Sequence, residues 1–298
     1  ARLEREAAGL ERRYPDPAAR PPLYGLLVGV KDIIHVEGIA TGAGMDVASA
    51  ELQCEDATCV SRLKSAGALI LGKTVTTCYA DLSFSPGLTR NPHNPEHTPG
   101  GSSSGSAAGV AAGLCGLALG TQTGGSLTRP AAYCGVVGFK PSYNRVSCAG
   151  VMPLAPSLDH VGLIAADVER VRLAARVVCG NWETAFPNRL PALGIPTGTY
   201  LNFTSEEGRG YFRETCDRLQ AAGYYLIELE AFTDFESICE RHGQLVAGET
   251  VLSHRDRLKR AGWPFPEPVR VGATYSSEFP AVNRAGRDKV RRELTSLM

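Results

Sequence analysis

Short apolar runs alternate with helical patterns along this chain, and that alternation restricts its fold more than any other feature. The apolar runs predict strands at 26–30, 68–71, 116–119, 136–139, 193–195 and 224–229. The patterns between and beyond them predict helices at 56–66, 104–112, 168–178, 205–222 and around 280–297, with a charged helix near the first residue. An alternation of this kind is typical of an α/β protein whose single large mixed or largely parallel sheet is flanked by helices. The small residues at 106–112, SAAGVAA, predict a helix that packs very close to the sheet.

Two clusters of glycine and serine interrupt this pattern. One reads GGSSSGS at 100–106, and the other reads GTQTGGS at 120–126 and ends at Ser126. A glycine pair before a serine lets successive backbone N–H groups turn toward one point, because glycine tolerates positive φ and tight geometry. Such a concavity beside a hydroxyl is an oxyanion hole, with Thr123, Gly124 and Gly125 as candidate donors. Taken alone, either cluster is equally compatible with a flexible loop or an ordinary turn.

Serine at its free pKa is a poor nucleophile and requires a base. Serine–lysine pairs are known alongside serine–histidine pairs. Lys31, in the segment GVKD at 29–32, is the candidate base, although a lone lysine after an apolar run is more often a solvated surface residue. The joint occurrence of the three segments in this order is what favours catalysis.

These segments and their neighbours resemble the amidase signature family, serine hydrolases that cleave carbon–nitrogen amide bonds with a Ser, cis-Ser, Lys triad. The resemblance is strong from about residue 24 to 165 and weak afterwards. It is carried by GLLVGVKD at 25–32, LGKT at 71–74, TRNP at 89–92, TPGGSSSGS at 98–106, GTQTGGS at 120–126, RPA at 129–131, GVVGFKP at 135–141 and SLD at 157–159.

The resemblance implies a role for each matched residue. Ser126 corresponds to the nucleophile, Ser102 to the serine that follows a cis peptide bond, and Lys31 to the base. Neutral Lys31 would take a proton from Ser102 while Ser102 takes one from Ser126. Ser126 Oγ would then attack the amide carbonyl, the oxyanion would lie among the N–H groups of 123–126, and water would hydrolyse the acyl-enzyme. No metal or organic cofactor is required.

Two positions depart from the family's pattern. Gln122 occupies a position where many members have aspartate, and Cys78 one where an acidic residue is common. Neither belongs to the triad, but both weaken an assignment to the family's subunit that converts glutamyl-tRNA. The loop at 79–86 is a candidate lining of the acyl pocket, although its aromatic and leucine residues are more often simply core.

A competing enzyme class is suggested by GSSSG at 101–105, which satisfies the G-x-S-x-G pattern of a serine esterase with Ser103 as nucleophile. That nucleophile elbow requires a preceding strand, and the prolines and asparagines of NPHNPEHTP at 91–99 oppose one. Asp159 and His160 are candidate partners, but adjacent residues of an extended segment point to opposite faces. A non-catalytic subunit or fragment that retains the amidase-like fold is the remaining alternative.

Other motifs have weaker support. The sequence GALILGKT at 67–74 satisfies the P-loop pattern, but its apolar strand lies between the two glycines, where a P-loop has its flexible cradle. His93 and His97 are four residues apart, yet the neighbouring prolines oppose a helix that would pair them as metal ligands. Cys54 and Cys59 have no second cysteine pair to complete a zinc site. We therefore expect neither nucleotide nor metal binding.

Composition indicates which partners and which cellular location to expect. The 298 residues include 31 basic and 31 acidic ones, so net charge gives no reason to expect a nucleic acid or an anionic membrane as partner. Nine cysteines without framework spacing and the lack of a secretory signal predict reduced thiols and a cytoplasmic location. The expected partner is a small-molecule amide substrate, and a homodimer is compatible with the sequence.

The ends of the chain suggest that both are truncated relative to a full-length member of the family. The sequence begins at Ala1 without methionine and stops within a helical pattern near residue 297. We expect a single amidase domain over 1–298, with the signature core at about 24–165 and the region 190–298 on the substrate side of the same domain.

Overall fold

The computed structural model describes residues 2–45, 54–80, 89–183, 189–259 and 279–297. The chain divides into two compact units. The first contains Ala1–Trp182 and Glu249–Val271, and the second contains Glu183–Gly248 and Gly272–Met298. No helix within the described ranges is long and apolar enough to cross a membrane.

A five-stranded mixed sheet forms the centre of the first unit, in the order β2-β1-β3-β5-β4. The strands are β1 (Leu27–Lys31), β2 (Leu69–Thr74), β3 (Leu117–Gln122), β4 (Val137–Phe139) and β5 (His160–Ala165). β1 pairs in parallel with both β2 and β3, whereas β5 pairs antiparallel with β3 and β4. The predicted mixed α/β core is therefore confirmed.

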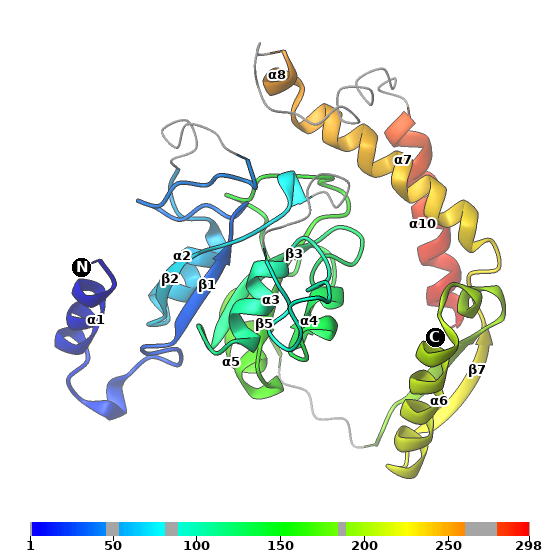
Figure 1. Cartoon of the computed structure of the whole chain (residues 1–298), viewed down its shortest axis with the longest axis horizontal. Helices are drawn as coiled ribbons and strands as arrows, with labels where there is room; N and C mark the ends of the chain where they lie inside the picture. The colour runs from blue at the N-terminus through cyan, green and yellow to red at the C-terminus, as the bar shows by residue number, and fades with distance from the viewer. Residues whose placement is uncertain (1, 46–53, 81–88, 184–188, 260–278, 298) are drawn as a thin grey trace. The chain divides into compact units, whose positions relative to one another are not determined.

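Helices cover both faces of this sheet (Figure 1). On one face, α2 (Thr58–Ser65) and α5 (Val168–Val178) contact each other and bury large aliphatic side chains with those of the strands. On the other face, α3 (Ser104–Ala111) and α4 (Thr128–Tyr133) contribute mainly alanines. Successive strand residues point to opposite faces, so Leu117 and Leu119 belong to the first layer of core and Ala118 to the second.

Small residues let α3 approach the sheet closely, as its sequence predicts. A β-carbon built on Gly105 of α3 would lie 2.4 Å from the backbone nitrogen of Val75, just beyond β2. One built on Gly120 of β3 would lie 3.0 Å from Ser103 Oγ, at the start of α3. Helix and strand backbones are therefore nearly in contact at the end of the sheet where the glycine–serine clusters lie.

The second unit has a smaller sheet, in which β6 (Ala192–Thr197) and β7 (Tyr225–Glu230) pair in parallel. α6 (Glu206–Ala221) connects them, and Ser205 caps its first turn by accepting a hydrogen bond from the N–H of Gly208. The remaining elements are α1 (Arg2–Arg13), the 3-10 turns η1 (Pro17–Ala19), η3 (Cys78–Ala80) and η4 (Gly198–Phe203), and helices α7 (Phe235–Ser253), α8 (Arg255–Leu258) and α10 (Phe279–Leu297). The residues of α7 from Glu249 onward belong to the first unit.

Candidate active site

Chain topology brings Lys31 and the two glycine–serine clusters to one edge of the main sheet. β1 and β3 are parallel neighbours, so their carboxyl ends lie at the same edge. Lys31 is the last residue of β1, and the segment that leads to Ser126 leaves β3 at that edge. Ser102 lies just before α3, which packs against both strands. Residues 31, 102 and 126 are thus gathered by the fold although they are far apart in sequence.

Lys31 is fully buried, and its ammonium end is bound by two hydroxyl groups. Its Nζ lies 2.8 Å from Ser102 Oγ and 2.7 Å from Thr121 Oγ1. Burial lowers the pKa of Lys31 from 10.5 to about 7, against an opposing effect of the negative charge on Asp159. A lysine with this pKa has a substantial neutral fraction at neutral pH, and its free lone pair can then accept a proton.

The segment that carries Ser102 packs directly against the segment that carries Ser126. The N–H of Ser103 donates to the carbonyl oxygen of Ser126 over 3.1 Å. A β-carbon on Gly101 would lie 2.9 Å from Ser126 Cα, so this approach requires glycine. Both serines are buried, with Ser102 0% and Ser126 7% exposed.

The peptide bond before Ser102 differs from what the resemblance implies. None of the described residues has a cis peptide bond, and the Gly101–Ser102 bond is trans. The expectation of a cis bond here is corrected. The trans form is the ordinary one for a residue other than proline, favoured by roughly 3–4 kcal/mol.

The turn before Ser126 has N–H groups without a hydrogen-bond acceptor among the described residues. Gly125 has φ of +117°, which favours glycine, and a β-carbon built there would meet no atom within 4 Å. The N–H groups of Gly124, Gly125 and Ser126 donate to none of the other described residues. Backbone donors of this kind, close to a serine hydroxyl, are suited to stabilising an oxyanion.

Gln122 fixes the start of the helix that follows Ser126. Its Oε1 accepts hydrogen bonds from the N–H groups of Leu127 and Thr128, at 3.1 and 2.9 Å, and from Thr128 Oγ1 at 3.0 Å. These are otherwise unpaired donors of the first turn of α4. An amide oxygen thus supplies the acceptor at the position where many family members have aspartate.

Ser103 has a structural role. It is fully buried, its Oγ donates to the carbonyl oxygen of Thr121 over 3.1 Å, and the N–H of Thr121 donates to the same Oγ over 3.2 Å. None of residues 91–101 before it forms a strand, so the nucleophile elbow of the esterase alternative is absent. The geometry therefore disfavours Ser103 as a nucleophile.

The structure also places the residues of the other motifs that the sequence analysis considered. Residues Leu69–Thr74 form β2, and Lys73 there contacts the carbonyl oxygen of Ile34, Thr41 Oγ1 and the Asp32 carboxylate at 2.7, 2.8 and 3.1 Å. His93 and His97 lie outside any helix. No cluster of three or more metal-binding side chains occurs within the described ranges. Residues 81–86 of the candidate acyl-pocket loop lie outside those ranges, and Tyr79 is buried against His254.

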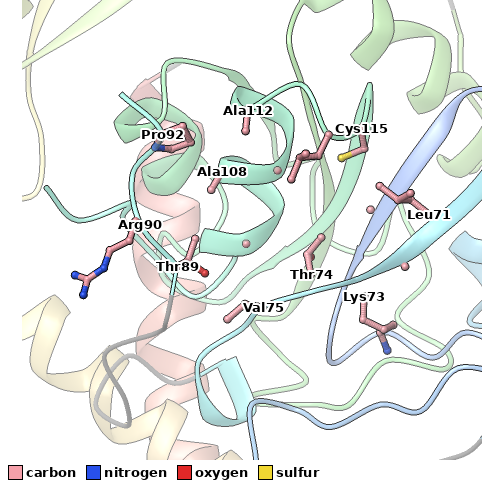
Figure 2. A pocket seen from close by; sticks show the side chains of 15 residues that line it. Leu71, Lys73, Thr74, Val75, Thr89, Arg90, Pro92, Ala108, Ala112 and Cys115 are labelled. Carbon is pink, nitrogen blue, oxygen red and sulfur yellow. The ribbon is translucent and has the colours of Figure 1, made fainter. Parts of the chain in front are cut away.

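A cavity of about 480 Å³ lies on a different part of the first unit (Figure 2). It is bordered by β2 and by α3, and its lining is mostly apolar, with Leu71, Val75, Ala108 and Cys115 among its side chains. None of Lys31, Ser102 and Ser126 lines it. It is therefore separate from the candidate active site.

Sequence reasoning did not identify the contacts of two side chains that hold the site together. Thr121 is the second hydroxyl on Lys31, and Asp159 accepts a hydrogen bond from Thr123 Oγ1 over 2.6 Å. Thr121 and Thr123 lie in the nucleophile segment itself. Asp159 lies in the SLD motif, so a signal was available, but the motif gave no indication of which side chain its carboxylate contacts.

Comparison with known proteins finds relatives that share one name. A glutamyl-tRNA(Gln) amidotransferase subunit from Salinibacter ruber is 40% identical over 222 residues, covering 68% of this chain and 43% of that protein. The corresponding protein from Roseiflexus castenholzii, which has the same name, is 44% identical, covering 88% of this chain and 61% of that protein. The chain spans about half the length of these curated relatives. Proteins with that name are therefore similar to this chain despite its departures from the family's pattern at Gln122 and Cys78.

Solved structures agree with the sequence comparison. A structure described as an amidase is 33% identical with a TM-score of 0.88, and the match covers 98% of this chain and 69% of that one. The peptide amidase of Stenotrophomonas maltophilia is 26% identical with a TM-score of 0.79, covering 95% of this chain and 68% of that one. The family model named Amidase matches residues 1–210. The chain belongs to the Amidase family.

Proposed function

We propose that this chain carries the active site of an amidase, which hydrolyses a carbon–nitrogen amide bond through Ser126, Ser102 and Lys31. The observation that carries the proposal is the fully buried Lys31, whose Nζ lies 2.8 Å from Ser102 Oγ and whose pKa is lowered to about 7. A buried lysine whose partners among the described residues are both hydroxyl groups is a poor structural cation but a suitable base.

Proton transfer would begin at Lys31. In its neutral form the amine donates one N–H to Thr121 Oγ1, which orients its lone pair toward Ser102. Ser102 gives its proton to Lys31 and takes the proton of Ser126, whose Oγ forms a bond to the amide carbonyl carbon. The carbon–nitrogen bond then breaks, and Ser102 returns a proton to the departing amine or ammonia.

Charge in the tetrahedral intermediate would be held by the turn before the nucleophile. The donors are the N–H groups of Gly124, Gly125 and Ser126, with that of Thr123 at the start of the turn. Each well-placed donor of this kind contributes about 3–4 kcal/mol to stabilising the transition state. Water would then hydrolyse the acyl-enzyme by the same relay and release a carboxylate.

Covalent labelling with a fluorophosphonate, followed by peptide mass spectrometry, tests this assignment. We expect an adduct on Ser126 in the wild type and in Ser103→Ala, and none in Ser126→Ala. Lys31→Met should slow labelling by about 100-fold or more, because it removes the base. The wild-type rate should rise with pH through about 7, because only neutral Lys31 accepts a proton.

Two outcomes would contradict the proposal. An adduct on Ser103 would support the esterase alternative. A folded wild-type protein without any serine adduct would indicate a non-catalytic amidase-like chain. With Ser126 labelled, release of ammonia or amine from a panel of small primary amides, aryl amides and peptide amides would identify the substrate class.

A second candidate follows from the names of the curated relatives, which are 40% and 44% identical to this chain. As part of a glutamyl-tRNA(Gln) amidotransferase, the chain would pass the amide nitrogen to an acceptor instead of releasing it, and would act with further subunits. Turnover of a primary amide that rises when glutamyl-tRNA(Gln) is added would favour this candidate. Turnover that does not respond to the acceptor would favour the simple amidase.

A further inference from the structure

Asp159 occupies a position that links the oxyanion turn to a second loop. It precedes β5, whose antiparallel register with β3 pairs Gln122 with His160. Continuing that register by one residue places Thr123 opposite Asp159. The observed contact agrees, since Thr123 Oγ1 donates to Asp159 Oδ1 over 2.6 Å.

The other carboxylate oxygen of Asp159 binds the loop before β5. Its Oδ2 accepts the N–H groups of Leu154 and Ala155 at 2.9 and 3.0 Å. One carboxylate therefore joins three donors from two segments that have no regular structure of their own. A charged acceptor makes such hydrogen bonds shorter and stronger than neutral ones.

The loop that Asp159 holds is itself attached to the end of α7. Thr250 Oγ1 donates to the carbonyl oxygen of Leu154 over 3.0 Å, and Glu249 Oε2 accepts the N–H of Ser157 over 2.9 Å. His254 Nε2 lies 2.8 Å from the carbonyl oxygen of Pro153. All of these residues belong to the first unit. The loop is thus fixed at its far side, and Asp159 connects that fixed loop to Thr123.

We propose that Asp159 is a positioning residue of the amidase site, whose carboxylate holds Thr123 and thereby the turn that donates to the oxyanion. This inference rests on the proposed function. Asp159 acts through the turn and does not contact the reacting atoms. Its side chain is half-buried, so its hydrogen bonds are partly protected from water.

Electrostatics gives Asp159 a second effect on the same site. Its negative charge raises the pKa of Lys31 against the larger lowering by burial. The charge also raises the pKa of Cys148, where burial is the larger cause, and that of His160, where burial and then Lys140 have the opposite effect. Removing the charge should therefore move the titration of Lys31 to lower pH.

Three variants separate the positional effect from the electrostatic one. Asp159→Asn keeps the size of the side chain but loses the charge and one acceptor. Thr123→Val removes only the hydroxyl that binds Asp159 and leaves the charge in place. Asp167→Asn is the matched control, because it removes a carboxylate that caps α5, where asparagine is an equally good cap.

The measurement is the second-order rate of fluorophosphonate labelling at Ser126 as a function of pH. We expect both Asp159→Asn and Thr123→Val to lower the rate by about 10- to 100-fold, because the oxyanion donors lose their fixed position. The pH at which the rate rises should fall in Asp159→Asn and stay at the wild-type value in Thr123→Val. Asp167→Asn should match the wild type in both respects.

Amide hydrogen exchange gives a readout that does not depend on activity. The N–H groups of Leu154 and Ala155 should exchange faster in Asp159→Asn than in the wild type, and at the wild-type rate in Thr123→Val. Wild-type labelling rate and pH dependence in Asp159→Asn would overturn the inference, as would a wild-type labelling rate in Thr123→Val. A wild type that is not labelled at Ser126 would instead contradict the proposed function itself.

Discussion

The two sheets in the described part of the chain bury their strands very differently. In the main sheet, Leu117 and Leu119 of β3 are fully buried, and helices cover both faces. In the small sheet, Tyr225 of β7 is 71% exposed and Ile227 is 41% exposed. Polar groups that would stay hydrated in the small sheet, such as a lysine side chain, are desolvated in the main one. Burial on both faces is therefore what converts an ordinary lysine into a candidate base at the edge of the main sheet.

The strongest test of this contrast is Lys31→Met. We expect it to slow labelling of Ser126 by about 100-fold or more and yet raise the free energy of unfolding by a few kcal/mol near neutral pH, because a buried ammonium is removed. Below about pH 7 Lys31 is protonated in the folded state, which then carries the full desolvation penalty. Between about 7 and 10.5 the unfolded state binds a proton that the folded state does not, so the wild type gains stability as pH rises.

Urea titrations at about pH 6 and about pH 9.5 measure this effect. The free energy of unfolding of Lys31→Met should exceed that of the wild type most at the lower pH, and the difference should be smaller at the higher pH. Lys64→Met, which removes a partly exposed lysine paired with Asp56, is the control and should change stability by less than about 1 kcal/mol at both. If the difference in free energy of unfolding between Lys31→Met and the wild type is equal at the two pH values, Lys31 is not desolvated in the folded protein.

Glycine substitutions should distinguish the packing of the two regions. A β-carbon on Gly162 of β5 would lie 2.4 Å from the carbonyl oxygen of Phe139, so Gly162→Ala should destabilise the protein by about 1–3 kcal/mol. A β-carbon on Gly210 of α6 meets no atom within 4 Å, so Gly210→Ala should stabilise by about 0.5–1 kcal/mol. Thermal unfolding of both variants measures whether each substitution lowers or raises stability. If Gly210→Ala destabilises the protein as much as Gly162→Ala does, the two regions do not differ in packing at these glycines.

The smallest effect is expected on the exposed face of β7. Tyr225→Thr replaces a largely exposed aromatic side chain with another strand-forming residue, and should change the free energy of unfolding by less than about 0.5 kcal/mol. Urea titration against the wild type measures it. A loss above about 2 kcal/mol would indicate that Tyr225 is buried in the folded protein.

The same contrast explains how much the sequence could predict. Local pattern was sufficient for β1, β2 and β3, which appear within a few residues of the predicted runs. β5 was not predicted, although its apolar run at 161–165 is compatible with a buried strand; its place between β3 and β4 depends on pairing that local pattern does not encode. α4 was also missed, since it has only 6 residues and contains Pro130. α7 gave no clear signal because its apolar residues do not form one distinct stripe.

Within the site, the sequence predicted residue types better than contacts. Lys31 is buried beside Ser102, as a base for that serine requires, and its catalytic role stays a prediction. The hydroxyl of Thr121 and the carboxylate of Asp159 were missed, because their partners are chosen by the pairing of β3 with β1 and β5. The trans bond before Ser102 could not be predicted from composition or spacing.

The long sequence separations within the site have a consequence for a chain that is still being synthesised. Lys31 meets Ser102 and Thr121 across 71 and 90 residues. Until those segments have left the ribosome and folded, Lys31 is hydrated and has the pKa of an ordinary lysine, so it is protonated and cannot act as a base. On the proposed mechanism, the serines of the nascent chain would stay unactivated until β3 joins the sheet and Lys31 is buried.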